Sequence, residues 1–215
     1  MKQTLCSLLS LVLVIFLMSS CYRGPEDLPK LKKKFQSQIN QFEKQKENTD
    51  DKVEVAVEKL TSFQQAIKDA ENADAEFKKV YNQWHKVNKE VKDLNKEYER
   101  LKNDADNLFN AMENQTNSLG DATTRNELNG AIAKTRGSYN TTLKNTEKAV
   151  SSLNSLHGEA LEIIKALEVA VAVGEIANIN TGLKNIESRV DAIMGELNIT
   201  ISQSKELYET RIGAF

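Results

Sequence analysis

The sequence has very little proline and cysteine, and both shortages limit what the chain can be. Its two prolines, Pro25 and Pro29, lie near the start of the 215 residues, so no proline ring excludes helical structure after Pro29. Its two cysteines are Cys6, inside an apolar run, and Cys21. If the segment before Cys21 is removed, one cysteine remains and no disulfide framework is possible. We therefore expect a largely helical mature chain that is held together by packing alone.

An excess of charge of one sign is also missing. The chain has 29 Lys and Arg against 31 Asp and Glu, which gives a formal net charge of −2. Proteins that bind nucleic acid usually carry a clustered positive charge, because they must neutralise phosphates. We therefore expect no nucleic-acid partner.

Residues that carry catalysis or bind metal are scarce. The only histidines, His85 and His157, are far apart in the sequence, and two histidines supply at most half of a zinc shell. Neither a glycine-rich phosphate loop nor a Gly-x-Ser-x-Gly elbow is present. Carboxylates are abundant, but they alternate with lysines as on the exposed flank of a coiled coil. We expect no enzyme activity, no cofactor and no metal site.

The one uninterrupted apolar run lies at the start of the chain. A cationic stretch at residues 1–4 precedes the apolar residues 5–18, and two small residues, Ser19 and Ser20, follow. This pattern is typical of a secretory signal peptide, because the run is too short to span a bilayer comfortably. We therefore expect residues 1–20 to be a signal peptide that is removed on export.

The end of this segment, Met18-Ser19-Ser20-Cys21, resembles the lipobox of bacterial lipoproteins, with Met18 where that family usually has Leu. The resemblance covers the export segment only. It implies that the thiol of Cys21 takes up a diacylglycerol and that Cys21 becomes the first mature residue, anchored in the membrane. Tyr22 stands where an Asp would resemble the signal for retention at the inner membrane, so the outer membrane is favoured. The alternative is a plain signal peptide with Cys21 as an incidental thiol.

Residues 21–30 contain glycine and both prolines without an apolar pattern, and we interpret them as a tether. Apolar residues then recur at helical spacing and predict an N-terminal helical extension over residues 31–50. These apolar residues are Leu31, Phe35, Ile39 and Phe42. A polar cluster follows at residues 48–51, where Asp51 and Glu54 have the form of a capping box. The sequence leaves open whether the chain hinges there or continues as one helix.

From residue 53 to residue 112 a seven-residue apolar repeat predicts a long coiled-coil helix. The first row of this seam is Phe77, Trp84, Val91, Tyr98, Ala105 and Met112. The second row is Val80, Val87, Leu94, Leu101 and Leu108. Upstream, the seam continues as Ala56, Leu60, Phe63, Ile67 and Ala70. It slips by one position around Asp74, which we interpret as the drift of a 3.6-residue helix against a strict seven.

Turn-forming residues at 115–121 predict a first reversal, with Thr124 and Glu127 available to cap the next helix. The second seam is Leu128, Ile132, Tyr139, Leu153, Leu156, Ala160, Ile163 and Leu167. This helix needs bulky partners, because the middle of its seam holds only small residues. These are Thr135, Thr142, Thr146 and Ala149. Gly174 and residues 178–182 indicate a second reversal. The third seam is Leu183, Ile186, Val190, Ile193, Leu197, Ile201 and Leu207.

Three one-faced helices joined by two turns predict an all-α fold. Specifically, they predict an elongated antiparallel three-helix bundle or coiled coil over residues 51–215, preceded by the extension. The helix over about residues 51–115 would be roughly 95 Å long at 1.5 Å per residue. A first turn near Ser118 would place Tyr98 beside Tyr139, and Trp84 beside Leu153 and Leu156.

The third predicted helix is shorter and should stop near the level of Tyr139. The tip of the first hairpin would then be two helices thick, and the lipidated end would lie at the opposite pole. A poorly covered apolar surface commonly finds a partner, although these side chains could also satisfy one another. The possible contact residues are Leu101, Leu108, Phe109, Met112, Leu119, Leu128 and Ile132.

In general character the mature part is similar to exported coiled-coil bacterial proteins of unknown function, through residues 132–139 and 190–197. We expect a lipid-anchored protein of the bacterial cell envelope that serves as a non-catalytic spacer, scaffold or docking rod. Its expected partners are the membrane, through the lipid on Cys21, and a protein or a second copy bound through coiled-coil surfaces.

Two other functions stay open at this point. The first is a surface-exposed adhesin or ligand-binding lipoprotein. The second is a membrane-active, toxin-like protein, suggested by the apolar residues 160–179. Four charged residues interrupt that segment, so it should not span a bilayer unaided. They are Glu162, Lys165, Glu168 and Glu175.

Overall fold

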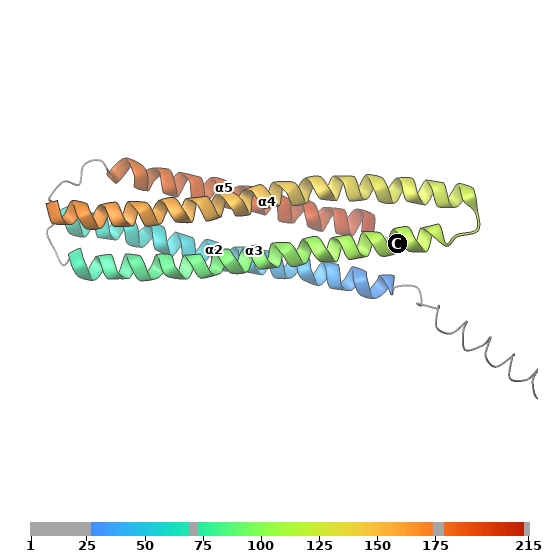
Figure 1. Cartoon of the computed structure of the whole chain (residues 1–215), viewed down its shortest axis with the longest axis horizontal. Coiled ribbons are helices and arrows are strands. Elements are labelled where there is room, and N and C mark those ends of the chain that lie inside the picture. Colours follow the sequence, from blue (N-terminus) through green and yellow to red (C-terminus); the bar gives the residue numbers. More distant parts are fainter. Residues whose placement is uncertain (1–26, 69–72, 174–178, 213–215) are drawn as a thin grey trace, which may run out of the picture.

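The computed structural model describes residues 27–68, 73–173 and 179–212, and these residues form an all-α protein (Figure 1). The four helices are α2 (Leu28–Lys68), α3 (Ala73–Asn117), α4 (Ala122–Val173) and α5 (Ile179–Leu207). A short π-helical turn, η1 (Tyr208–Ile212), continues α5.

The helices form one elongated bundle in which successive helices run in opposite directions (Figure 1). Helix α2 packs on α3 and α5, and α4 packs on the same two helices. Each helix therefore has two neighbours, which is the up-down-up-down arrangement that short connections favour. The apolar seams face inward, as predicted, and meet in one continuous core.

The predicted single helix over residues 51–115 is wrong, because α2 ends at Lys68 and the chain reverses before α3 begins at Ala73. The ring of Phe63 lies 5.8 Å from that of Phe77, and Lys34 Nζ lies 2.7 Å from Asp104 Oδ1. The slip of the seam near Asp74 therefore marks a reversal and not a drift of the heptad. Folding back lets α2 and α3 bury their apolar faces against each other, which a straight helix would leave in water.

Residues 31–50 are consequently not an extension, and the three-helix bundle is a bundle of four helices. The apolar residues Phe35, Ile39 and Phe42 are fully buried in the common core. Helix α2 continues through residues 48–51 without a hinge, so Asp51 and Glu54 do not form an N-terminal cap. The expected boundaries at residues 30 and 50 therefore fall inside one helix, while the expected signal peptide and residues 21–26 of the tether lie outside the described residues.

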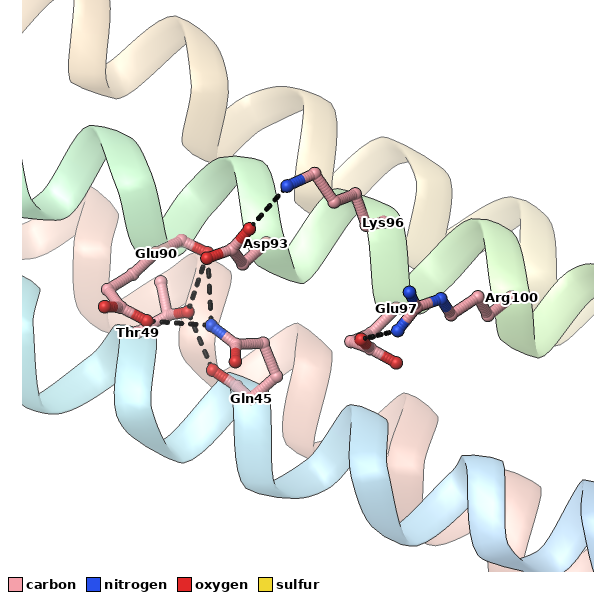
Figure 2. A network of polar contacts seen from close by, with 7 residues as sticks. All are labelled: Gln45, Thr49, Glu90, Asp93, Lys96, Glu97 and Arg100. Atoms are coloured by element: carbon pink, nitrogen blue, oxygen red, sulfur yellow. Dashed lines mark hydrogen bonds and ion pairs between the residues drawn. The ribbon is translucent and has the colours of Figure 1, made fainter.

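Polar side chains also bridge α2 and α3 where the predicted hinge would have been (Figure 2). Gln45 Nε2 donates to Glu90 Oε2 at 2.9 Å, and the buried Thr49 hydroxyl donates to Gln45 O at 2.7 Å. The same hydroxyl lies 3.4 Å from Glu90 O. The cluster around residue 49 therefore serves the contact with α3 and not the start of a helix.

Helix α4 contains the thin middle that its seam predicts. Thr142 and Thr146 are buried, and Thr146 donates its hydroxyl to Thr142 O at 3.0 Å. Such bonds to the preceding turn satisfy a threonine hydroxyl inside an apolar core. The bulky partner comes from α2, because the ring of Phe35 lies 5.3 Å from that of Tyr139 in an edge-on arrangement.

The pairing of α3 with α4 is close to the predicted register, with Tyr98 near enough to Tyr139 to affect its pKa, and the observed contacts fall one to four residues further along α4. The hydroxyl of Tyr98 donates to Leu143 O at 3.3 Å, and the ring of Trp84 lies 5.9 Å from that of His157. The turn falls between Asn117 and Ala122 and so centres after Ser118, which moves each partner further along α4. Asp121, and not Thr124, caps α4 by accepting the Thr124 N–H at 2.6 Å.

Two further expectations concern the ends of the bundle. Helix α5 ends at the predicted level, since Phe35 lies against both Tyr139 and Tyr208. The expected pole of the chain start is wrong, because the first turns of α2 lie beside the α3–α4 hairpin and not at the other end (Figure 1). Because the bundle has one more helix than predicted, the chain reverses once more, and its start lies at the opposite end of the bundle from the one expected. The second predicted reversal falls at residues 174–178, outside the described residues.

Candidate functional site: a groove where the chain enters the bundle

A groove of about 740 Å³ lies at the pole where α2 begins. Within the described residues, the column formed by α5 and η1 ends at Ile212, at the level of the first turns of α2, while α3 and α4 continue further. The α3–α4 hairpin extends past the start of α2 and the end of α5 (Figure 1). The groove therefore forms where the bundle thins from four helices to two.

Apolar side chains from three helices and the connecting turn form most of the lining. They are Leu28 and Pro29 of α2, Met112 of α3, Leu119 of the turn, and Leu128, Ala131 and Ile132 of α4. Polar residues complete it: Lys32, Gln115, Thr116, Thr135, Thr210 and Arg211. In the part of the chain that the structure describes, the lining thus includes two basic residues and no acidic residue.

The seven possible contact residues divide into two groups. Leu101, Leu108, Phe109 and Ile132 are buried, so the expected poor cover of these residues is wrong. The first turns of α2 cover them, which an extension would not have done. Met112 and Leu128 are half-buried and Leu119 is 36% exposed, and all three line the groove together with Ile132. The structure therefore brings four of the seven residues together at one place.

Ion pairs and hydrogen bonds hold the hairpin that forms one side of the groove. The guanidinium of Arg136 lies 3.0 Å from Glu113 Oε1 and 3.3 Å from Asp106 Oδ1. The hydrogen bond to Glu113 raises the pKa of Arg136, so the guanidinium stays charged. At the turn, Asn129 Nδ2 donates to Asn117 Oδ1 at 2.9 Å. The spacing of α3 and α4 is thus fixed before any ligand arrives.

A second groove, of about 520 Å³, lies between α2 and α5 and has the opposite character. Six carboxylates line it: Asp50, Asp51, Glu54, Glu58, Glu187 and Asp191. No group of three or more histidine, cysteine or carboxylate residues among the described residues is arranged to hold a metal ion. We therefore interpret this groove as a solvated acidic surface.

The two histidines approach each other, as the predicted pairing of α3 and α4 implied. Burial lowers the pKa of His157, and the nearby His85 and Lys92 lower it further. Nδ1 of His157 is buried and accepts no hydrogen bond within the described part of the chain. Trp84 packs against the imidazole, so His157 is a neutral side chain of the core.

Cys21 lies outside the described residues, so the structure places only the start of the bundle that follows it. Six residues, 22–27, separate Cys21 from Leu28, the first residue of α2. Across the described helices, none combines the length and hydrophobicity that a membrane span requires. The apolar stretch considered for membrane insertion contributes Ala160, Ile164 and Leu167 to the core.

Sequence reasoning missed the sides of the groove that α2 and η1 contribute, including Leu28, Lys32 and Arg211. The error follows from treating residues 31–50 as an extension. A usable signal was present, because Leu31, Phe35, Ile39 and Phe42 form an apolar face that must be covered. That face requires a fourth helix in the bundle.

Comparison with known proteins gives one result. A family model described as "Protein of unknown function (DUF2959)" matches residues 22–210. Neither a curated protein nor a solved structure matches the chain. The match begins directly after Cys21 and includes all four helices and every described residue that lines the groove except Arg211. The chain therefore belongs to the DUF2959 family of proteins of unknown function.

Proposed function

We propose that this protein is a lipid-anchored component of the bacterial cell envelope, in which the four-helix bundle serves as a non-catalytic scaffold that stands on the membrane. The observation that carries the proposal is the position of Leu28. Helix α2 starts seven residues after the cysteine of the lipobox-like motif, with its first turn at the pole that holds the groove. Seven extended steps span at most about 25 Å, so an acylated Cys21 would keep this pole close to the lipid surface.

The surface of the bundle supports a scaffold more than a catalyst. Ion pairs between exposed side chains lie along the helices, such as Lys96 with Asp93 at 2.7 Å and Arg100 with Glu97 at 2.5 Å (Figure 2). Pairs of this kind contribute little stability and are typical of a solvated helical face. A rod of this kind would need length and stiffness, and the continuous apolar core supplies the stiffness.

A protein partner or a second copy remains part of the proposal. Large exposed apolar side chains include Tyr81 on α3, Val169 on α4 and Ile199 on α5. They lie on different helices and do not gather into a groove, and single exposed apolar residues are normal on protein surfaces. Docking of a protein would therefore use the mixed polar flanks of the helices.

A ligand-binding lipoprotein is the second candidate, and one observation favours it over an adhesin. The groove at the chain-start pole is concave and mostly apolar, with a few polar groups, as sites for small ligands usually are. At a lipidated pole this groove would face the membrane, whereas an adhesin requires a binding surface that points away from the cell.

Metabolic labelling with an alkyne-bearing fatty acid tests the anchor. Wild type and Cys6→Ala should incorporate the label at the same level and fractionate with membranes. Cys21→Ala should incorporate none and lose its membrane association. Cys6→Ala is the matched control, because it removes the other thiol of the leader. Equal labelling of Cys21→Ala would contradict the lipid anchor, and so would an unlabelled wild type.

Position on the membrane tests the scaffold. In the wild type, a protease added to sealed vesicles that display the protein outward should cut near the far pole, where α2 ends at Lys68 and α4 ends at Val173, before it cuts between Asn117 and Ala122. The Cys21→Ala protein in solution should lose this order of cutting. If the anchored and the free protein are cut in the same order, the chain-start pole does not stand on the membrane.

A further inference from the structure

The groove at the chain-start pole has the composition of a lipid site. We propose that it binds one acyl chain of an anionic phospholipid from the anchoring membrane. Its apolar residues would surround the acyl chain, while Arg211 would meet the phosphate. This inference rests on the proposed lipid anchor for its source of ligand, and it assigns that anchored pole a specific ligand.

The first argument is chemical. Of the thirteen described residues that line the groove, seven are apolar, two are basic and none is acidic. The chain as a whole is slightly acidic, and its other large groove is lined by six carboxylates. The absence of acidic groups is therefore a local property of this lining. An apolar lining with a positive rim matches an acyl chain that is joined to a phosphate.

The second argument is size. A volume of about 740 Å³ lies within the range of small-molecule sites, roughly 300–1,000 Å³. A protein partner of ordinary affinity covers a much larger surface, about 800 Å² on each side. A groove of this volume suits one flexible chain better than a helix or a strand.

The third argument is position. The lipid on Cys21 would hold Leu28 within about 25 Å of the membrane surface, because seven residue steps cannot reach further. Tethering of this kind converts binding into an effectively intramolecular event at millimolar concentration. Phospholipid would then be the ligand at by far the highest local concentration at this pole.

Photocrosslinking tests the proposal on the full mature protein. The acylated protein is reconstituted in vesicles of phosphatidylethanolamine and phosphatidylglycerol, the latter with a diazirine on one acyl chain. After illumination, mass spectrometry locates the modified residues. We expect adducts on Met112, Leu128 and Ile132. In vesicles of phosphatidylcholine that carries the same diazirine, the yield should fall at least fivefold.

Two pairs of variants separate the groove from general hydrophobicity. Leu119→Glu with Leu128→Glu places charge on side chains that are not fully buried, and should reduce crosslinking at least tenfold. Val169→Glu with Ile199→Glu changes residues that are 63% and 60% exposed and do not line the groove, and should leave the yield unchanged. Arg211→Gln should remove most of the preference for phosphatidylglycerol without lowering the helix content measured by circular dichroism.

The outcomes distinguish this proposal from the anchor. Acylated protein that shows no adducts in the groove, or equal losses in both double variants, overturns the lipid site and leaves the anchor intact. Unacylated Cys21→Ala protein that still gives groove adducts when mixed with the vesicles supports the site without the anchor. Crosslinks from the groove residues to a second copy of the chain would show that the occupant is protein and would overturn the proposal.

Discussion

Replacement of Phe35 by alanine tests whether α2 is a structural member of the bundle. Phe35 is 0% exposed, and its ring lies 5.3 Å from the ring of Tyr139 and 6.1 Å from that of Tyr208. Truncation of a buried phenylalanine typically lowers the free energy of unfolding by about 3–5 kcal/mol. For a domain of this size each kcal/mol shifts the midpoint by about 2–4 °C, so we expect a fall of roughly 6–20 °C.

The assay is thermal and urea unfolding of the mature chain, followed by circular dichroism at 222 nm. Val169→Ala is the matched control, because this side chain is 63% exposed and its truncation should change the free energy by less than about 0.5 kcal/mol. If Phe35→Ala is as stable as this control, residues 31–50 do not pack in the core. The four-helix arrangement, and with it the groove, would then be refuted.

Three further changes test individual side chains. Burial lowers the pKa of His157 below 6.5, so the folded protein binds this proton less readily than the unfolded chain does. The free energy of unfolding should therefore fall as the pH drops below about 6.5. In His157→Leu, the urea midpoint should depend less on pH between pH 5 and 8. Tyr139→Phe removes a buried hydroxyl whose nearest polar group is the Ser204 side chain and that makes no hydrogen bond of ordinary geometry in the described part of the chain. The change should leave the free energy of unfolding unchanged or raise it by up to about 1 kcal/mol, whereas a clear loss would show that the contact with Ser204 stabilises the fold. Arg136→Met removes the ion pairs with Glu113 and Asp106 and should cost about 1 kcal/mol in low salt and less in 1 M salt; equal losses in both would mean that packing, not charge, matters.

The sequence predicted the fold class and the core well, because both depend on a local pattern. A seven-residue repeat of apolar residues reports which face of a helix is buried, whatever that face meets. Trp84, Val91 and Leu94 are accordingly buried where the seam placed them. The end of α5 was also predictable, because it follows from counting residues between the turns.

The number of helices was not predictable in the same way. A reversal at residues 69–72 carries no proline, and the seam on either side differs only by a slip of one position. Such a slip fits a drifting coiled coil as well as a break. The contacts that decide between them are long-range, such as Gln38 Nε2 with Glu97 Oε2 at 2.7 Å, and a periodic pattern contains no information about its partner.

This one misplaced reversal also determined the reading of the site. With three helices, the α3–α4 tip is a bare hairpin that points away from the membrane and invites a protein partner. With four helices, α2 covers Leu108 and Phe109, and the same tip lies beside the tether. What the described residues leave there is the groove lined by Met112, Leu119, Leu128 and Ile132. An apolar opening with a basic rim is costly to expose to water, so its position next to the expected lipid anchor argues for a ligand that the membrane itself supplies.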